Sequence, residues 1–122
     1  MSWADLFPAF PDTFRAAMVH PLWTGDTSSL GSNLYSALNL LEAVAWWAVA
    51  LVVGRRALRE QRAPLLEGIY VAAFVIFGLT DVIESRVVNL ALIGGKGLNF
   101  ALILVLRAMI RRGPYADRKP AF

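Results

Sequence analysis

The chain has 122 residues, of which 57% are hydrophobic and only 17% are charged, which favours one membrane-embedded domain because an average soluble domain has roughly 25% charged residues. The absence of cysteine and the single histidine, His20, exclude disulfides, thiolate metal sites and a histidine-rich metal centre within one chain. The formal charge of +3 does not indicate nucleic-acid binding, because the basic residues flank apolar runs and form no basic stripe.

Residues 1–31 hold no long apolar run. Before Arg15 the chain carries two aspartates and no basic residue, so this segment lacks the positive start and continuous apolar core of a secretory signal. The stretch TFRAAMVHPLWTG is mildly amphipathic, and the aromatic residues around it suit the headgroup region. We therefore expect a short interfacial segment on the outer side of the membrane, in preference to a ligand-binding lid.

Two membrane-spanning helices are predicted from apolar runs that match a bilayer core of about 30 Å, which needs about 20 helical residues. The first covers about residues 34–54; a loop rich in capping residues precedes it, and Arg55 and Arg56 follow it. The second covers about residues 65–84, and Pro64 lies just ahead of it, where proline suits the first turn of a helix. The stretch between them, residues 55–64, is a short basic loop.

The third span has two interpretations, because residues 94–97, Gly-Gly-Lys-Gly, interrupt its apolar run. In one, a single helix covers residues 86–107, with Lys96 near the midplane of the bilayer. In the other, residues 86–95 form a turn or a short interfacial helix, and the span covers about 96–111. We favour the interpretation with the span at 96–111, because glycine is a poor helix former. The single helix over 86–107 would also leave almost no loop for the reversal after the second span.

The basic residues are unevenly distributed, which predicts the orientation in the membrane. Nine of the twelve lie in the loop at 55–64 or from Arg107 to the end of the tail at 112–122. That side should be cytoplasmic, so we expect the amino terminus outside, the carboxyl terminus inside and three spans, in a bacterial inner membrane. For Glu67, near the inner end of the second span, the predicted partners are Arg55, Arg59 and Arg62.

Six polar or charged residues are predicted to lie in the outer half of the spans. They are Asn39, Glu42, Asp81, Glu84, Lys96 and Asn99. Each helix contributes two of them at a spacing of three residues, which places each pair on one helix face. Because a low dielectric strengthens interactions between such groups, we expect one polar network that closes the outer half of the bundle.

Glu42 is the most costly member of this set. At helical rise it lies about 12 Å below the outer boundary of the first span, where a carboxylate costs about 2.5 kcal/mol or more to insert. We therefore expect it to be protonated, paired or facing a wet cavity, and to point into protein. Asp81, Glu84 and Lys96 fit an interfacial ion cluster that fixes a turn, whereas Glu42 is the candidate functional carboxylate.

Catalytic motifs are not found in the sequence. It contains no Gly-x-Ser-x-Gly elbow, no phosphate loop and no His-Glu-x-x-His helix. Asp81 and Glu84 form a weak acid/base signal, because carboxylates three residues apart are common on helices. We therefore expect no enzyme and no metal site, and no particular cofactor is indicated.

Two functional classes remain. The first is an accessory or assembly subunit of a larger membrane complex, which a small bundle with short loops and a basic tail suits. The alternative is a homo-oligomeric channel or transporter for an ion or small solute, with Glu42 as the membrane-embedded carboxylate. The expected partners are the lipid bilayer and other membrane subunits or copies of the chain itself, and not nucleic acid.

Overall fold

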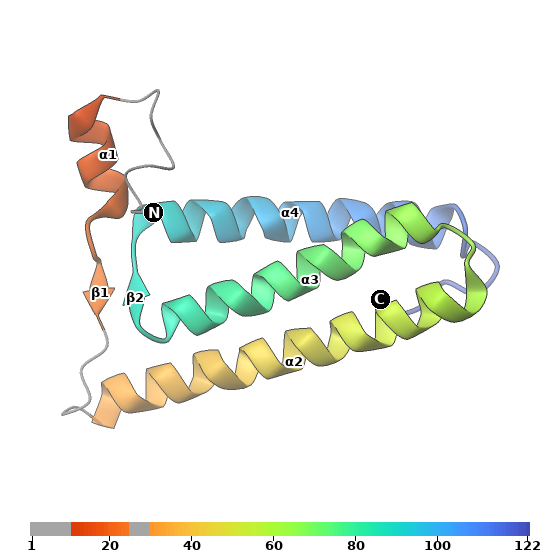
Figure 1. Ribbon diagram of the computed structural model, residues 1–122, viewed down its shortest axis with the longest axis horizontal. Coiled ribbons are helices and arrows are strands. Elements are labelled where there is room, and N and C mark those ends of the chain that lie inside the picture. The colour runs from red at the N-terminus through yellow and green to blue at the C-terminus, as the bar shows by residue number, and fades with distance from the viewer. Residues whose placement is uncertain (1–10, 25–29) are drawn as a thin grey trace.

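The computed structural model describes residues 11–24 and 30–122. In these ranges the chain forms α1 (Asp12–Val19), β1 (Trp23–Thr24), α2 (Leu30–Glu60), α3 (Pro64–Glu84), β2 (Val87–Val88) and α4 (Leu90–Arg112). Helices α2, α3 and α4 are each long and apolar enough to cross a membrane. Figure 1 shows them running along the long axis of the molecule. The prediction of an all-α integral membrane bundle with three membrane-spanning helices is therefore confirmed.

Helices α2 and α3 form an antiparallel pair that stays in contact from end to end. Near one end, Ser36 Oγ donates to the carbonyl oxygen of Ser85 over 2.7 Å. At mid-length, Trp47 Nε1 donates to the carbonyl oxygen of Val75 over 3.2 Å. Helix α2 is longer at both ends than the predicted span, so only residues 61–63 separate it from α3, which starts at Pro64 as expected.

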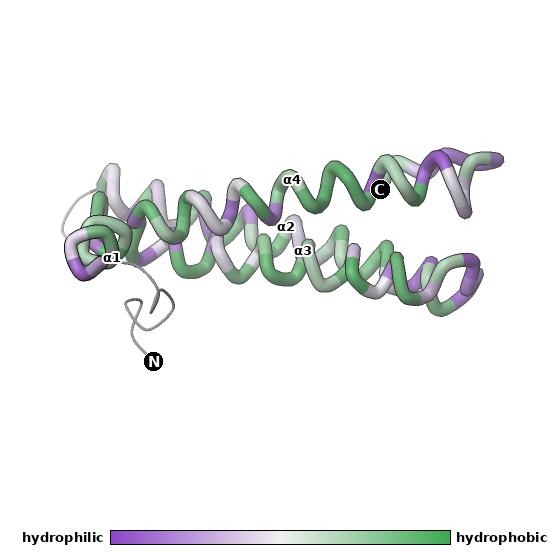
Figure 2. Tube along the Cα trace, turned by 90° about the horizontal axis from the view of Figure 1, so that it is seen from above, coloured by the Kyte–Doolittle hydropathy of each residue, from purple (hydrophilic) through white to green (hydrophobic). Residues whose placement is uncertain are grey.

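The core lies on α3, the central helix of the bundle. Of its most apolar stretch 39% is buried, against 22% for both α2 and α4, because α3 packs against each of them. Trp46 of α2 stacks on Phe74 with ring centroids 5.7 Å apart and meets the edge of Phe77 at 4.9 Å. Figure 2 shows that hydrophobic residues dominate the middle of the long helices, while hydrophilic ones gather at the end that holds the α2–α3 loop, called the loop end below.

The described part of the amino-terminal segment lies across the other end of the bundle (Figure 1). β1 pairs antiparallel with β2, so that Trp23 lies opposite Val88 and Thr24 opposite Val87. The amide of Leu22 adds a hydrogen bond of 2.6 Å to the carbonyl oxygen of Val88. Helix α1 contacts α4. This strand pairing ties the segment that was expected to be interfacial to the reversal between α3 and α4.

Helix α4 begins earlier than the favoured interpretation of the third span requires. It starts at Leu90, where the side chain of Asn89 accepts a hydrogen bond of 2.8 Å from the amide of Leu92. The expectation that residues 86–95 form a separate turn or short helix is therefore wrong: the reversal is complete by Asn89, and the glycines at 94–97 lie inside the long helix. An asparagine cap satisfies a first-turn amide, and membrane helices tolerate glycine more readily than soluble ones do.

Candidate functional site

Lys96 and two carboxylates form a compact ion cluster between α3 and α4. Lys96 Nζ donates to Asp81 Oδ1 over 2.5 Å and to Glu84 Oε2 over 2.6 Å. The two acids are three residues apart, so both face α4. Asp81 is fully buried, and 20% of the Lys96 side chain is exposed. The ammonium also lies 5.0 Å from the centroid of the Phe77 ring.

The cluster holds more acceptors than its single ammonium satisfies. Asp81 Oδ2 is buried and has no hydrogen-bond partner among the described residues. Two carboxylates of α3 share the one ammonium of Lys96 on α4. The contacts are therefore those of an ion cluster that joins two helices.

The other three predicted residues do not join this cluster. Asn99 Nδ2 donates to the carbonyl oxygen of Ala73 over 2.9 Å, which links α4 to α3 separately. Asn39 is buried, but its Nδ2 donates to the carbonyl oxygen of Tyr35 on its own helix over 3.0 Å. Glu42 is exposed and has no hydrogen-bond or ion-pair partner in the described part of the chain. The expected single network of six is therefore wrong for one copy of the chain.

The separation of Asn39 and Glu42 has a geometric cause. Three residues along an α-helix turn the side chain by about 300°, so the two directions differ by about 60°. That is enough to place Asn39 on the face toward α3 and Glu42 beyond the edge of that face. One turn to either side of Glu42, Leu38 and Ala45 are exposed as well. Within one copy, Glu42 therefore lies on an apolar, uncovered face of α2 and does not point into protein as expected.

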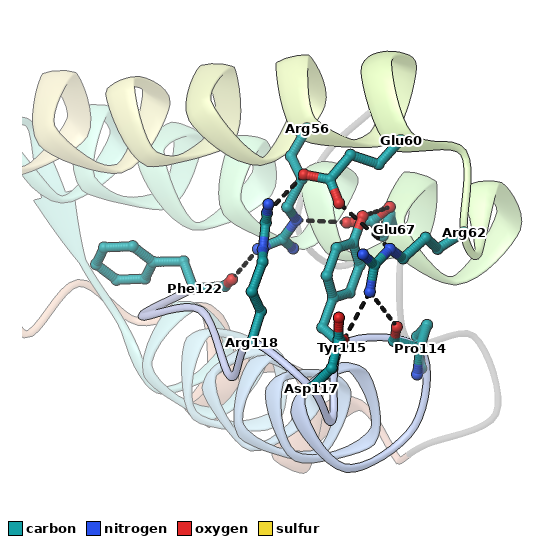
Figure 3. A network of polar contacts seen from close by, with 9 residues as sticks. All are labelled: Arg56, Glu60, Arg62, Glu67, Pro114, Tyr115, Asp117, Arg118 and Phe122. Carbon is teal, nitrogen blue, oxygen red and sulfur yellow. Dashed lines mark hydrogen bonds and ion pairs between the residues drawn. The ribbon is translucent and has the colours of Figure 1, made fainter.

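The loop end of the bundle holds a second polar network, which the sequence revealed only in part (Figure 3). Glu67 is fully buried and accepts hydrogen bonds from Arg56 Nε over 2.7 Å and from the Tyr115 hydroxyl over 3.1 Å. Its partner is thus Arg56 and none of the three predicted arginines. Burial along α2 gives the reason, because Ala50 and Val53 face α3 and Arg56 follows three residues later on the same side.

The segment after α4 folds back onto this network instead of extending away as a tail. Arg62 Nη1 donates to Asp117 Oδ1 over 2.7 Å and to the carbonyl oxygen of Pro114 over 3.1 Å. Arg118 Nη2 donates to Glu60 Oε1 over 2.5 Å. The Tyr115 ring is buried, with the Arg62 guanidinium 4.8 Å from its centroid. These contacts tie the last ten residues to the loop between α2 and α3.

Two groups in this folded segment have shifted acidities. Burial raises the pKa of the Tyr115 hydroxyl, and the neighbouring charge of Glu67 raises it further. The hydrogen bond from Arg62 lowers the pKa of the Asp117 carboxyl. The Tyr115 shift follows from its burial beside Glu67 of α3, and the Asp117 shift follows from its contact with Arg62 in the loop between α2 and α3.

In the described ranges, no three or more histidine, aspartate or glutamate side chains are grouped to hold a metal ion. The polar groups that are present form ion pairs and helix contacts, with Glu42 set apart from them. No protein-family model, no curated protein and no solved structure matches this chain.

Proposed function

We propose that the protein is an accessory or assembly subunit of a larger membrane complex, and that the face of α2 around Glu42 binds a helix of a partner subunit. One observation carries the proposal: Glu42 is an exposed carboxylate without a described partner, within a helix that is long and apolar enough to cross a membrane. Arg55, at the start of the basic region, lies about 20 Å away along the helix axis, so Glu42 falls within the bilayer core of about 30 Å.

A carboxylate left in contact with lipid at that depth is unfavourable by about 2.5 kcal/mol or more. The bundle itself does not relieve this cost, because Lys96 is already engaged by Asp81 and Glu84. A partner helix with a basic, amide or hydroxyl side chain at the same depth would relieve the cost. Ala45, one turn from Glu42, is small and exposed, so a second helix can approach α2 closely there.

The location proposed for this subunit follows from the distribution of charge. We place the α2–α3 loop and the segment after α4 in the cytoplasm, and β1 and the α3–α4 reversal on the outer side of a bacterial inner membrane. The excess of basic residues at the loop end supports this orientation.

The alternative is a homo-oligomeric channel or transporter, and the same exposed carboxylate favours it. Three helices leave little room for a pathway within one copy. In a closed ring of copies, the Glu42 side chains would meet around a common axis and bind a cation or a proton. The two functions differ in what covers the Glu42 face, which is a different protein in one case and the same chain in the other.

Photo-crosslinking in native membranes tests the proposal directly. A photoreactive residue at Leu41, beside Glu42, should form a product with a different polypeptide, and the protein purified in mild detergent should carry that polypeptide. The matched control is Leu98 of α4, which is 77% exposed, against 66% for Leu41. A product with a second copy would favour the channel or transporter instead. Equal products at both positions, or none at Leu41, would contradict a docking face at Glu42.

Variants of Glu42 separate the two functions further. Glu42→Gln keeps hydrogen-bonding atoms and should keep the partner bound, whereas Glu42→Leu should release it. If the protein transports an ion, Glu42→Gln alone should abolish the flux, because an amide cannot supply the charge.

A further inference from the structure

A cavity of about 560 Å³ lies between the arginine-rich end of α2 and the segment that folds back after α4. Four arginines line it, together with one acidic residue and several apolar ones. The arginines are Arg55, Arg56, Arg59 and Arg118. Figure 3 shows Arg118 of the folded segment directed toward Glu60, and Arg56 of α2 directed toward Glu67 and the carbonyl oxygen of Phe122.

Two of the four arginines are already neutralised. Arg118 pairs with Glu60 over 2.5 Å, and Arg56 pairs with Glu67 over 2.7 Å. The other two, Arg55 and Arg59, are exposed and have no acidic partner in the described ranges. They are four residues apart on one face of α2, where like charges repel one another. The cavity therefore carries two guanidinium groups whose charges are uncompensated.

A third group at the cavity lacks a partner. Only 10% of the Arg56 side chain is exposed, and its Nη2 is buried without a hydrogen bond to any described residue. A buried donor left unsatisfied is unfavourable, so native structures generally supply it with an acceptor. Arg56 Nη1 already donates to the carbonyl oxygen of Phe122, whereas Arg56 Nη2 and the guanidinium groups of Arg55 and Arg59 have no acceptor among the described residues.

An anion with several acceptor oxygens satisfies these donors best. Arginine forks match phosphate and carboxylate oxygens in pairs. The apolar part of the cavity lining indicates which kind of anion fits. Val52, one turn from Arg55 and Arg56, is exposed on the membrane-spanning part of α2, and Phe122 also lines the cavity. A phosphate held at Arg55 and Arg59 would place an attached acyl chain along Val52, toward the bilayer core. Free phosphate would use the same donors and leave that wall uncovered.

We propose that this cavity binds the phosphodiester headgroup of an anionic phospholipid, with Arg55 and Arg59 as its principal contacts. The test is native mass spectrometry of the whole protein in mild detergent, titrated with phosphatidylglycerol or with phosphatidylcholine of the same acyl chains. We expect the anionic lipid to stay bound and the zwitterionic one to dissociate. Replacing both residues, Arg55→Gln with Arg59→Gln, should weaken phosphatidylglycerol binding roughly tenfold or more.

A matched control distinguishes a site from general attraction. Arg112→Gln with Lys119→Gln removes two positive charges from residues that line a different cavity, which also contains Arg107 and Arg111. This control should bind phosphatidylglycerol as the unmodified protein does. Arg55→Lys with Arg59→Lys keeps the charge but not the fork, and should fall between the unmodified protein and the glutamine pair.

Three results would overturn the proposal. The first is an equal loss of phosphatidylglycerol binding in the glutamine pair and in the control pair, and the second is equal retention of the two lipids. The third is displacement of phosphatidylglycerol by millimolar inorganic phosphate, which would identify a free-phosphate site. Because Arg55 and Arg59 are exposed and have no ion-pair partner among the described residues, the glutamine pair should unfold at the same temperature as the unmodified protein. If the glutamine pair unfolds at a lower temperature, phosphatidylglycerol binding by the lysine pair is compared with that of the unmodified protein instead, and unchanged binding would overturn the proposal.

Discussion

Lys96 Nζ on α4 lies 2.5 Å from Asp81 Oδ1 on α3, and Asp81 is fully buried. This ion pair joins two helices at the end of the bundle where the chain reverses between them. Glu84 shares the same ammonium, so one lysine compensates two carboxylates. The cost of removing each member should therefore be unequal.

Replacing Lys96 by methionine should lower the free energy of unfolding by about 3 kcal/mol, because two buried carboxylates would lose their only described cation. The partial exposure of Lys96 places the loss at the lower end of the range for broken buried pairs. Adding Asp81→Asn to this variant should recover part of the loss. The measurement is denaturant unfolding in detergent micelles. A Lys96→Met protein as stable as the unmodified one would show that the two carboxylates do not depend on Lys96 for compensation.

Gly78 allows α3 to approach Trp47 of α2 closely. A methyl group at Gly78 would lie 2.7 Å from Trp47 Cδ1 and closer still to Nε1. Gly78→Ala should therefore displace the indole, break its hydrogen bond to the carbonyl oxygen of Val75 and cost about 1–2 kcal/mol. Gly95→Ala is the control, because nothing lies within 4 Å of that position. It should leave stability unchanged or raise it by up to about 1 kcal/mol. Equal stability of the two variants would mean that Trp47 moves aside freely.

The sequence allowed the Asp81–Glu84–Lys96 cluster to be predicted from spacing alone. Two acids three residues apart share a helix face, and a tight reversal brings the start of the next helix beside them. The position of Glu42 was not predictable in this way. Whether it faces protein depends on where the α2–α3 interface ends around the helix, and that boundary is set by packing against α3.

The start of α4 depends on contacts that periodicity does not report. One capping side chain, Asn89, and the pairing of β1 with β2 end the reversal before the glycines. The strands are only two residues long and lie more than sixty residues apart in sequence. Such a short, long-range pairing leaves no alternation from which it can be recognised.

The Asn89 cap should determine how firmly α4 begins. Asn89→Ala removes the acceptor for the Leu92 amide and should cost about 1 kcal/mol, with faster hydrogen exchange at that amide. Asn89→Ser keeps an acceptor at the cap and should preserve slow exchange. If both variants exchange alike, the strand pairing of Val87 and Val88 holds the helix start without the cap.

Tyr115 should give the folded segment after α4 a dependence on alkaline pH. Tyr115→Phe removes the hydrogen bond to buried Glu67 and should cost about 1 kcal/mol at neutral pH. The folded-state pKa of Tyr115 is raised above its ordinary value of 10.0. The stability that the hydroxyl contributes is therefore fully present below that pH, and it is lost as the pH rises through the folded-state pKa.

Unfolding of Tyr115→Phe and of the unmodified protein should be compared at neutral pH and above about pH 10. The two stabilities should converge as the pH rises. A constant difference across that range would show that the phenol does not titrate in the folded segment. No difference at any pH would show that Tyr115 acts only through its ring, which packs against Arg56 and Arg62.

The orientation of the bundle can be measured because the chain contains no cysteine. Thr24→Cys in β1 and Ala116→Cys after α4 each introduce one thiol at an exposed position, at opposite ends of the molecule. In intact spheroplasts, a membrane-impermeant maleimide should label Thr24→Cys at once and Ala116→Cys only after permeabilisation, because the basic loop end is expected in the cytoplasm. Labelling in denaturant is the control that both thiols react. The reverse pattern would invert the proposed orientation and with it the membrane leaflet that supplies any lipid to Arg55 and Arg59. Labelling of both variants from outside would contradict an odd number of crossings.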